Sequence, residues 1–199
     1  MRKDAAVRVG RVGFTRAELE SFKGSSVPDL VGPGLKLLFV GINPGLWTAA
    51  TQTHFAHPGN RFYPALKLAE IIDRDLDRAE GMTEQDRAYL LSRGVGISNL
   101  VNRATSRADE LSAAELREGP LRLERLVRVW QPDVVAVGGV TAFRTAFSRP
   151  RARLGRQPDR LAGAELWVVP NPSGLNAHQT IATLATAYAE PALAAGIIQ

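Results

Sequence analysis

The sequence contains no cysteine in 199 residues. This absence excludes disulfides, thiolate nucleophiles, zinc–thiolate sites and iron–sulfur clusters. The sequence also has no apolar stretch long enough to span a bilayer, and its N-terminus lacks the apolar core of a signal peptide. We therefore expect a soluble cytoplasmic protein with no membrane partner.

Charge is the first positive signal. The chain carries 25 Lys and Arg residues against 20 Asp and Glu residues, a formal net charge of +5. Clustered basic side chains displace counterions from phosphates, so a basic domain favours a polyanionic partner. Many basic proteins bind no nucleic acid, however, so charge alone is weak evidence for a nucleic-acid partner. Residues 1–13 carry four of the basic side chains with little apolar pattern, and we expect a flexible basic arm there.

The rest of the chain, residues 14–199, predicts a single α/β domain. Compact apolar runs at 36–40, 133–138 and 166–170 are typical of buried strands, and residues 94–100 predict a turn or a short strand. Helical segments alternate with these runs. We expect helices over 61–72, 141–147 and 178–188, with further helix starts at Thr15, Thr83 and Ser112. This alternation predicts a three-layer αβα sandwich with a mostly parallel central sheet.

Two Asn-Pro loops follow predicted strands. GINPG occupies residues 41–45, and NPSGL occupies residues 171–175. Each loop alone is explained by ordinary turn formation, because Asn, Pro and Gly are common turn residues. Together they are more informative, because the carboxyl ends of parallel strands meet at one edge of a sheet, where such folds bind ligands.

Four motifs in order give the chain a resemblance to a known family. They are GINPG at 41–45, FAHPGNRF at 55–62, GISNLVNR at 96–103 and NPSGL at 171–175. The chain resembles the mismatch-specific uracil-DNA glycosylases, bacterial relatives of thymine-DNA glycosylase in the uracil-DNA glycosylase superfamily, over residues 35–188. The resemblance implies base-excision repair of double-stranded DNA that contains G·U or related mismatches.

The resemblance also implies roles in base flipping, which such an enzyme needs because a stacked base cannot be reached. Phe55 corresponds to the residue on which the flipped uracil stacks; the alternative is a core position beside Phe62. Leu175 corresponds to the apolar wedge that fills the gap in the duplex. Its neighbours in the same loop are then expected to contact DNA: Ser173, Gly174 and Asn176.

At the reacting centre, Asn43 corresponds to the catalytic residue, which holds the attacking water. An amide orients water but is no strong base, so the rate must come from positioning and charge stabilisation. Asn171 and the backbone near Ile42 are expected to stabilise the departing uracil anion. Thr48 corresponds to a position near the uracil C5 edge, where it influences whether thymine fits.

The motifs contain no Lys to form a Schiff base, so we expect a monofunctional glycosylase without cofactor. The histidines His54, His57 and His178 have no clustered acidic or Cys partners, and we expect no metal site. One active site on one domain makes a monomer the expectation.

Two sequence differences from the bacterial relatives favour a broader substrate range. Asn99 stands where some relatives have Lys, and the stretch after the wedge reads Asn176-Ala177-His178 without the usual basic residue. A further stretch, residues 149–160, is rich in Arg and predicts a loop, either solvated or in contact with phosphates.

Two other functions stay open. The first is a non-catalytic binder of mismatched or damaged DNA that uses the same pocket. The second is a nucleotide-metabolising α/β enzyme, which would act on free nucleotides and would not need Leu175.

Overall fold

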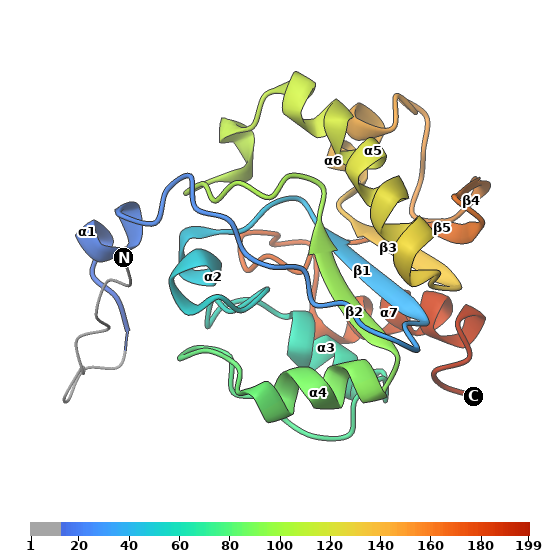
Figure 1. Cartoon of the computed structure of the whole chain (residues 1–199), viewed down its shortest axis with the longest axis horizontal. Coiled ribbons are helices and arrows are strands. Elements are labelled where there is room, and N and C mark those ends of the chain that lie inside the picture. Colours follow the sequence, from blue (N-terminus) through green and yellow to red (C-terminus); the bar gives the residue numbers. More distant parts are fainter. Residues whose placement is uncertain (1–12) are drawn as a thin grey trace.

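The computed structural model describes residues 13–199. The basic arm expected over 1–13 lies outside the described residues, apart from Gly13. Within the described part, five strands form one sheet in the order β2-β1-β3-β5-β4 (Figure 1). The strands are β1 (Leu37–Gly41), β2 (Val95–Asn99), β3 (Val134–Gly138), β4 (Gly155–Leu161) and β5 (Ala164–Val169). The pairs β1–β2, β1–β3 and β3–β5 are parallel, and only β4 is antiparallel to its neighbour.

Helices cover both faces of this sheet (Figure 1). They are α1 (Arg16–Glu20), α2 (Leu46–Thr51), α3 (Phe62–Leu68), α4 (Glu84–Ser92), α5 (Ala113–Trp130), α6 (Val140–Ala146) and α7 (Ile181–Ala194). Successive residues of a strand point to opposite faces. Accordingly, Leu37 and Phe39 of β1 pack in one core with α3, α4 and α7, whereas Leu38 and Val40 pack in a second core with α5 and α6. The expected three-layer αβα sandwich with a mostly parallel sheet is confirmed.

The expected helix starts are also confirmed. Thr15, Thr83 and Ser112 each accept a hydrogen bond from the backbone N–H three residues on, and in each case an acidic side chain at that position accepts one from the backbone N–H of the cap residue. These capping boxes satisfy backbone N–H groups that the first helical turn leaves unpaired. Among the described residues, no helix is long and apolar enough to cross a membrane.

Three predicted boundaries were wrong. Residues 149–160 are not all loop, because Gly155–Leu161 is the edge strand β4. The final helix begins at Ile181, after the cap at Thr180, and continues through Pro191 to Ala194. The helix predicted over 61–72 is shorter, because Glu70 adopts a left-handed conformation with φ 59° after the helix ends at Leu68. Residues 94–100, left open between turn and strand, form β2.

Candidate active site at the carboxyl edge of the sheet

Three asparagines meet the carboxyl edge of the parallel sheet, each from a different strand. Asn43 follows β1, Asn99 ends β2, and Asn171 follows β5. The loops after β1 and β2 are tied by backbone hydrogen bonds from Leu100 N to Gly41 O (2.9 Å) and from Val101 N to Ile42 O (3.0 Å). The edge predicted from the two Asn-Pro loops therefore carries a third amide.

The amide of Asn43 has a fixed orientation. Its Nδ2 donates to the carbonyl oxygens of Arg103 (2.9 Å) and Pro44 (3.2 Å) and to the hydroxyl oxygen of Thr105 (2.7 Å). Carbonyl oxygens only accept, so the atom that faces them must be the NH₂ group. The Thr105 hydroxyl itself donates to Arg107 O (2.7 Å). Asn43 Oδ1 has no hydrogen-bond donor among the described residues, so it is available to accept a hydrogen bond from water or substrate.

The amide of Asn171 has the opposite orientation, with its oxygen rather than its NH₂ group hydrogen-bonded. Its Oδ1 accepts a hydrogen bond from the backbone N–H of Ser173 (3.0 Å), the pattern of an Asx turn. A backbone N–H only donates, so the bonded atom must be the amide oxygen, and Nδ2 is left as a donor. Asn171 also lies near the β3 end, because a Cβ on Gly139 would be 3.7 Å from Asn171 Cβ and 3.5 Å from Ile42 Cδ1.

Asn99 was not predicted as a site residue, yet it is buried (3% exposed) with its amide oxygen directed at this edge. A Cβ built on Gly41 would lie only 2.6 Å from Asn99 Oδ1. Asn99 Nδ2 donates to His54 Nδ1 (3.3 Å), while His54 Nε2 donates to Pro28 O (2.9 Å). His54 is buried, and burial lowers its pKa, which favours the neutral ring that this pattern requires.

The backbone behind Asn99 is fixed by a polar cluster. Arg122, from α5, donates to Asn99 O (2.9 Å) and to Ser98 Oγ (3.0 Å), and it forms an ion pair with Asp29. Ser98 Oγ donates to the same carboxylate (2.7 Å). Each of these groups thus has a partner, as buried polar groups require.

Phe55 has an unusual conformation for a bulky residue, with φ 55° in the left-handed region. Its ring stacks on Phe62 with centroids 4.2 Å apart, and its Cζ would lie 3.2 Å from a Cβ on Gly41. Phe55 therefore does pack beside Phe62, as the alternative of a core position required, but its side chain is only partly buried. Strained conformations cluster at functional sites, and this one presents an aromatic ring at the same edge as the three amides.

Within the NPSGL loop, Asn171 is half-buried, whereas the tip of the loop is exposed. Leu175 is 90% exposed, and its backbone N–H donates to Ser173 Oγ (3.3 Å). Gly174 is also exposed, whereas Asn176 is partly buried and donates through Nδ2 to Asn171 O (3.3 Å). The structure thus brings the four residues predicted to contact DNA into one projecting loop.

The remaining predicted residues lie deeper. Ile42 is partly buried, and Thr48 is buried (6% exposed) in α2. The influence of Thr48 on thymine stays a prediction. Of the histidines, His54 is buried, and His57 and His178 are exposed. Within residues 13–199 no group of three or more His, Cys, Asp or Glu side chains is placed to hold a metal ion.

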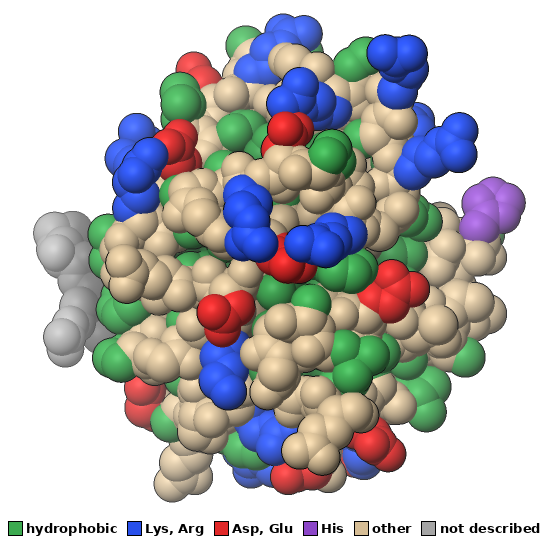
Figure 2. Space-filling model, turned by 90° about the vertical axis from the view of Figure 1, so that its right-hand side faces the viewer, with side chains coloured by type: hydrophobic (Ala, Val, Ile, Leu, Met, Phe, Trp, Pro, Cys, Tyr) green, Lys and Arg blue, Asp and Glu red, His purple; other side chains and the backbone are tan. Residues whose placement is uncertain are grey.

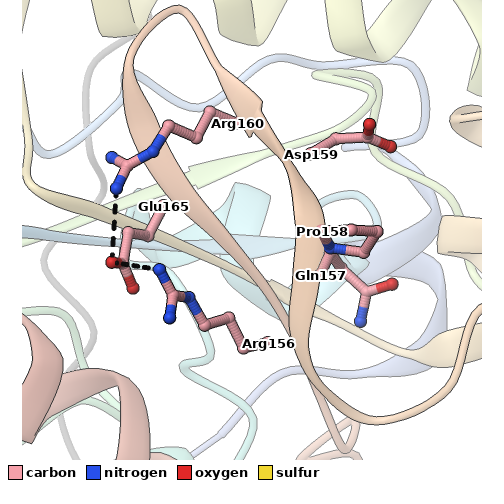
Figure 3. Close-up of a pocket in the computed structure, with 6 residues that line it drawn as sticks. All are labelled: Arg156, Gln157, Pro158, Asp159, Arg160 and Glu165. Atoms are coloured by element: carbon pink, nitrogen blue, oxygen red, sulfur yellow. Dashed lines mark hydrogen bonds and ion pairs between the residues drawn. The ribbon is translucent and has the colours of Figure 1, made fainter.

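The Arg-rich segment lies on the β4 side of the sheet. Figure 2 looks at the side of the molecule where β4 is found and shows basic side chains interspersed with acidic ones. Arg156 and Arg160 both form ion pairs with Glu165, and Figure 3 shows them converging on its carboxylate. Surface hollows of about 360 and 630 Å³ lie here, and neither is lined by a residue of the strand-end loops. Phosphate contact by this segment stays a prediction.

Comparison with known proteins agrees with this arrangement. Residues 28–192 match the model of the uracil DNA glycosylase superfamily. The fold is similar to the solution structure of a chain from Methanosarcina acetivorans described as a "putative Uracil DNA glycosylase", with a TM-score of 0.53 and 16% identity. The match covers 82% of this chain and 97% of that one. The matched region contains all three amides and the projecting loop.

Proposed function

The chain belongs to the uracil DNA glycosylase superfamily, and we propose that it is a monofunctional glycosylase that removes uracil from mismatched duplex DNA. The preferred substrate is a G·U pair, with thymine or other damaged bases as further substrates, and the protein acts as a monomer. Its reaction is hydrolysis of the N-glycosidic bond after the base has rotated out of the duplex.

One observation carries this proposal: the opposite orientation of two amides at one sheet edge. Asn43 has its NH₂ group occupied and its oxygen available, whereas Asn171 has its oxygen occupied and its NH₂ group available. Hydrolysis of a glycosidic bond needs an acceptor that orients water and a donor that stabilises the leaving group. The two loops supply one of each.

In the proposed reaction, Asn43 Oδ1 accepts a hydrogen bond from the attacking water and aims the water oxygen at the sugar C1′. The C1′–N1 bond breaks and its electron pair leaves with uracil, while the water oxygen bonds to C1′ and its proton passes to solvent. Asn171 Nδ2 donates to the uracil anion as charge develops. Asn43 accepts no proton, because an amide is no base at neutral pH.

Asn99 and Phe55 form the proposed base pocket. Asn99 Oδ1 accepts from uracil N3–H, and the second hydrogen of Nδ2 donates to uracil O4. Cytosine presents the reverse pattern, an acceptor at N3 and a donor at its exocyclic amine, so the amide orientation set by His54 favours uracil. The uracil ring stacks on Phe55, whose ring also stacks on Phe62.

The first experiment measures alkali-labile strand cleavage on labelled duplexes with G·U, A·U or G·T pairs and on single-stranded uracil. Wild type is compared with Asn43→Ala and with Asn102→Ala. Asn102 is a matched control because its side chain binds Val27 N–H (3.1 Å) rather than facing the sheet edge. We expect Asn43→Ala to lose roughly a thousandfold in turnover, as when one catalytic hydrogen-bonding group is removed, while keeping its affinity for the duplex.

The results separate the alternatives. Cleavage at G·U that survives in Asn102→Ala and falls in Asn43→Ala supports the glycosylase. Intact duplex binding without an alkali-labile product on any substrate favours the non-catalytic binder. Turnover of free nucleotides that is indifferent to Leu175→Ala favours a nucleotide-metabolising enzyme.

A further inference from the structure

One guanidinium group makes three hydrogen bonds to the loop that carries Leu175. Arg61 lies at the start of α3, and its Nη1 donates to the carbonyl oxygens of Asn176 (3.0 Å) and Ser173 (3.4 Å). Its Nη2 donates to Gly174 O (3.4 Å). A planar guanidinium can serve several acceptors at once, a geometry that the point charge of Lys cannot reproduce.

The backbone near Arg61 adds to this attachment. Arg61 N donates to Pro172 O (3.1 Å), so backbone and side chain of one residue bind both ends of the loop. Gly174 packs directly on the segment that precedes Arg61, since a Cβ on Gly174 would lie 2.6 Å from Gly59 O. The 57–61 segment that follows Phe55 and the loop that carries Leu175 therefore form one unit.

Within residues 13–199, the loop has few other anchors. Its remaining hydrogen bonds run mostly within itself, from Ser173 N to Asn171 Oδ1, from Leu175 N to Ser173 Oγ and from Asn176 N to Ser173 O. The Leu175 side chain itself is 90% exposed and holds nothing in place. The carbonyl contacts from Arg61 thus restrict a loop whose apolar tip points into solvent.

Arg61 is not needed to start its own helix. It occupies the N-cap position of α3, but its side chain makes no capping hydrogen bond there. Among the described residues, the side-chain hydrogen bonds of Arg61 all go to backbone carbonyls of the Leu175 loop. A substitution that keeps the backbone intact should therefore act on that loop rather than on α3.

We propose that Arg61 is a positioning residue that holds the Leu175 loop in the shape needed to enter a duplex, and so sets the preference for duplex over single-stranded uracil. The proposal rests on the proposed glycosylase function. A wedge matters only where a base must leave a stacked pair. Single-stranded uracil needs no wedge and uses the pocket at Phe55 and Asn99, which Arg61 does not contact through its side chain.

The test measures kcat/KM on G·U duplex and on single-stranded uracil for Arg61→Gln, Leu175→Ala and the double variant. We expect each single variant to lose about tenfold on duplex, the scale of about 1.4 kcal/mol expected for lost charge-assisted hydrogen bonds, with single-stranded activity near wild type. The double variant should be no worse than Leu175→Ala, because coupled residues give non-additive losses. A 2-aminopurine base beside the uracil should report less flipping in all three.

Two further variants sharpen the result. Arg61→Lys keeps the positive charge but loses the planar guanidinium that serves several acceptors, and it should behave like Arg61→Gln. Arg78→Gln is the matched control: Arg78 donates to Pro58 O (3.4 Å) and Asn60 O (3.2 Å), on the same segment, but not to the Leu175 loop. It should leave the duplex-to-single-strand ratio unchanged.

Equal losses on both substrates, additive losses in the double variant, or full activity of Arg61→Lys would each overturn the proposal. A wild-type protein that excises uracil from neither substrate would instead reject the glycosylase function on which it rests.

Discussion

The two Asn-Pro loops have similar sequences, yet they are held in different ways. In the loop after β1, Asn43 is fixed by Arg103 O and Thr105 Oγ1, which lie some 60 residues further along the chain. In the loop after β5, the amide of Asn171 is fixed by Ser173, two residues away, and the loop tip depends on Arg61. The amide of one loop is held by contacts distant in sequence, whereas the amide of the other is held by a local turn and the tip of that loop by Arg61.

The difference follows from what each loop has to do. Orienting water requires an acceptor with little freedom, and distant buried partners restrict it most strongly. Entering a duplex requires an exposed apolar side chain, and Leu175 is 90% exposed, so burial cannot stabilise it. We infer that changes that displace the groups around Asn43 will impair the chemical step on every substrate, whereas changes at the tip of the second loop, residues 173–175, will impair duplex substrates alone.

Among the glycine substitutions that test this contrast, the largest effect is expected for Gly41→Ala, at the end of β1. The added Cβ would lie 2.6 Å from Asn99 Oδ1 and 3.2 Å from Phe55 Cζ, so both would have to move. Misplacement of about 1 Å can cost roughly a hundredfold in rate, and we expect that loss on duplex and single-stranded uracil alike. Single-turnover kinetics on both substrates measures it.

Gly45→Ala is the control in the same loop. A Cβ on Gly45 meets nothing within 4 Å, and its φ of −75° suits any residue. It should keep wild-type rates. If Gly41→Ala spared single-stranded uracil, the inferred contrast between the loops would be wrong.

A smaller and more selective effect is expected for Gly174→Ala in the second loop. The Cβ would lie 2.6 Å from Gly59 O, a backbone atom that cannot turn aside, so the loop must move away from Arg61. We expect about a tenfold loss of kcat/KM on G·U duplex, comparable to the loss of a strong hydrogen bond, and none on single-stranded uracil. Gly59→Ala, whose Cβ would meet only the exposed His57 ring at 3.3 Å, should retain activity on both.

The buried histidine that supports Asn99 should also make stability depend on pH. Burial lowers the pKa of His54 below its ordinary value of 6.5, so between that value and the folded pKa the unfolded chain binds a proton that the folded chain does not. Stability should therefore fall as pH falls below 6.5, by up to about 1.4 kcal/mol per pH unit. Urea midpoints between pH 5 and 8 measure the slope.

His54→Gln should flatten that slope, and His57→Gln, at an exposed position, should not. A slope that is unchanged in His54→Gln would assign the pH dependence to another group.

The smallest expected effect is that of Leu175→Ala on stability. The side chain is 90% exposed, so its loss should change the free energy of unfolding by less than about 0.5 kcal/mol. Thermal unfolding in the absence of DNA checks this. A large drop in the unfolding temperature would mean that the loop packs on the domain more than its exposure indicates.

Much of the fold could be predicted from sequence because buried parallel strands are continuous apolar runs. The predictions over 36–40 and 133–138 differ from β1 and β3 by one residue or less at each end. β4 was missed because its sequence, GRQPDRL, is mostly exposed and has no apolar run. An edge strand packs on one neighbour only, so its residues need not be apolar.

The candidate site was predictable as a set of residues but not as a chemical arrangement. The motifs pointed to Asn43, Phe55 and Asn171, which the structure brings to the same edge. Which atom of each amide is free depends on partners distant in sequence, such as Arg103 for Asn43 and His54 for Asn99, and no local pattern reveals those contacts. The one sequence signal that could have identified Asn99 as a site residue was that Asn recurs at the ends of three predicted strand segments.

The two edges of the sheet have a consequence for self-association. An open edge exposes unpaired N–H and C=O groups that can template the addition of a foreign strand and begin aggregation. At β2, Leu30 occupies that position by exchanging backbone hydrogen bonds with Ile97 (2.8 and 2.9 Å). At β4, Pro158 lies where the ladder register shifts, and it offers no N–H to an incoming chain. Both edges of the sheet that orients the three amides thus carry a feature that hinders the addition of a further strand.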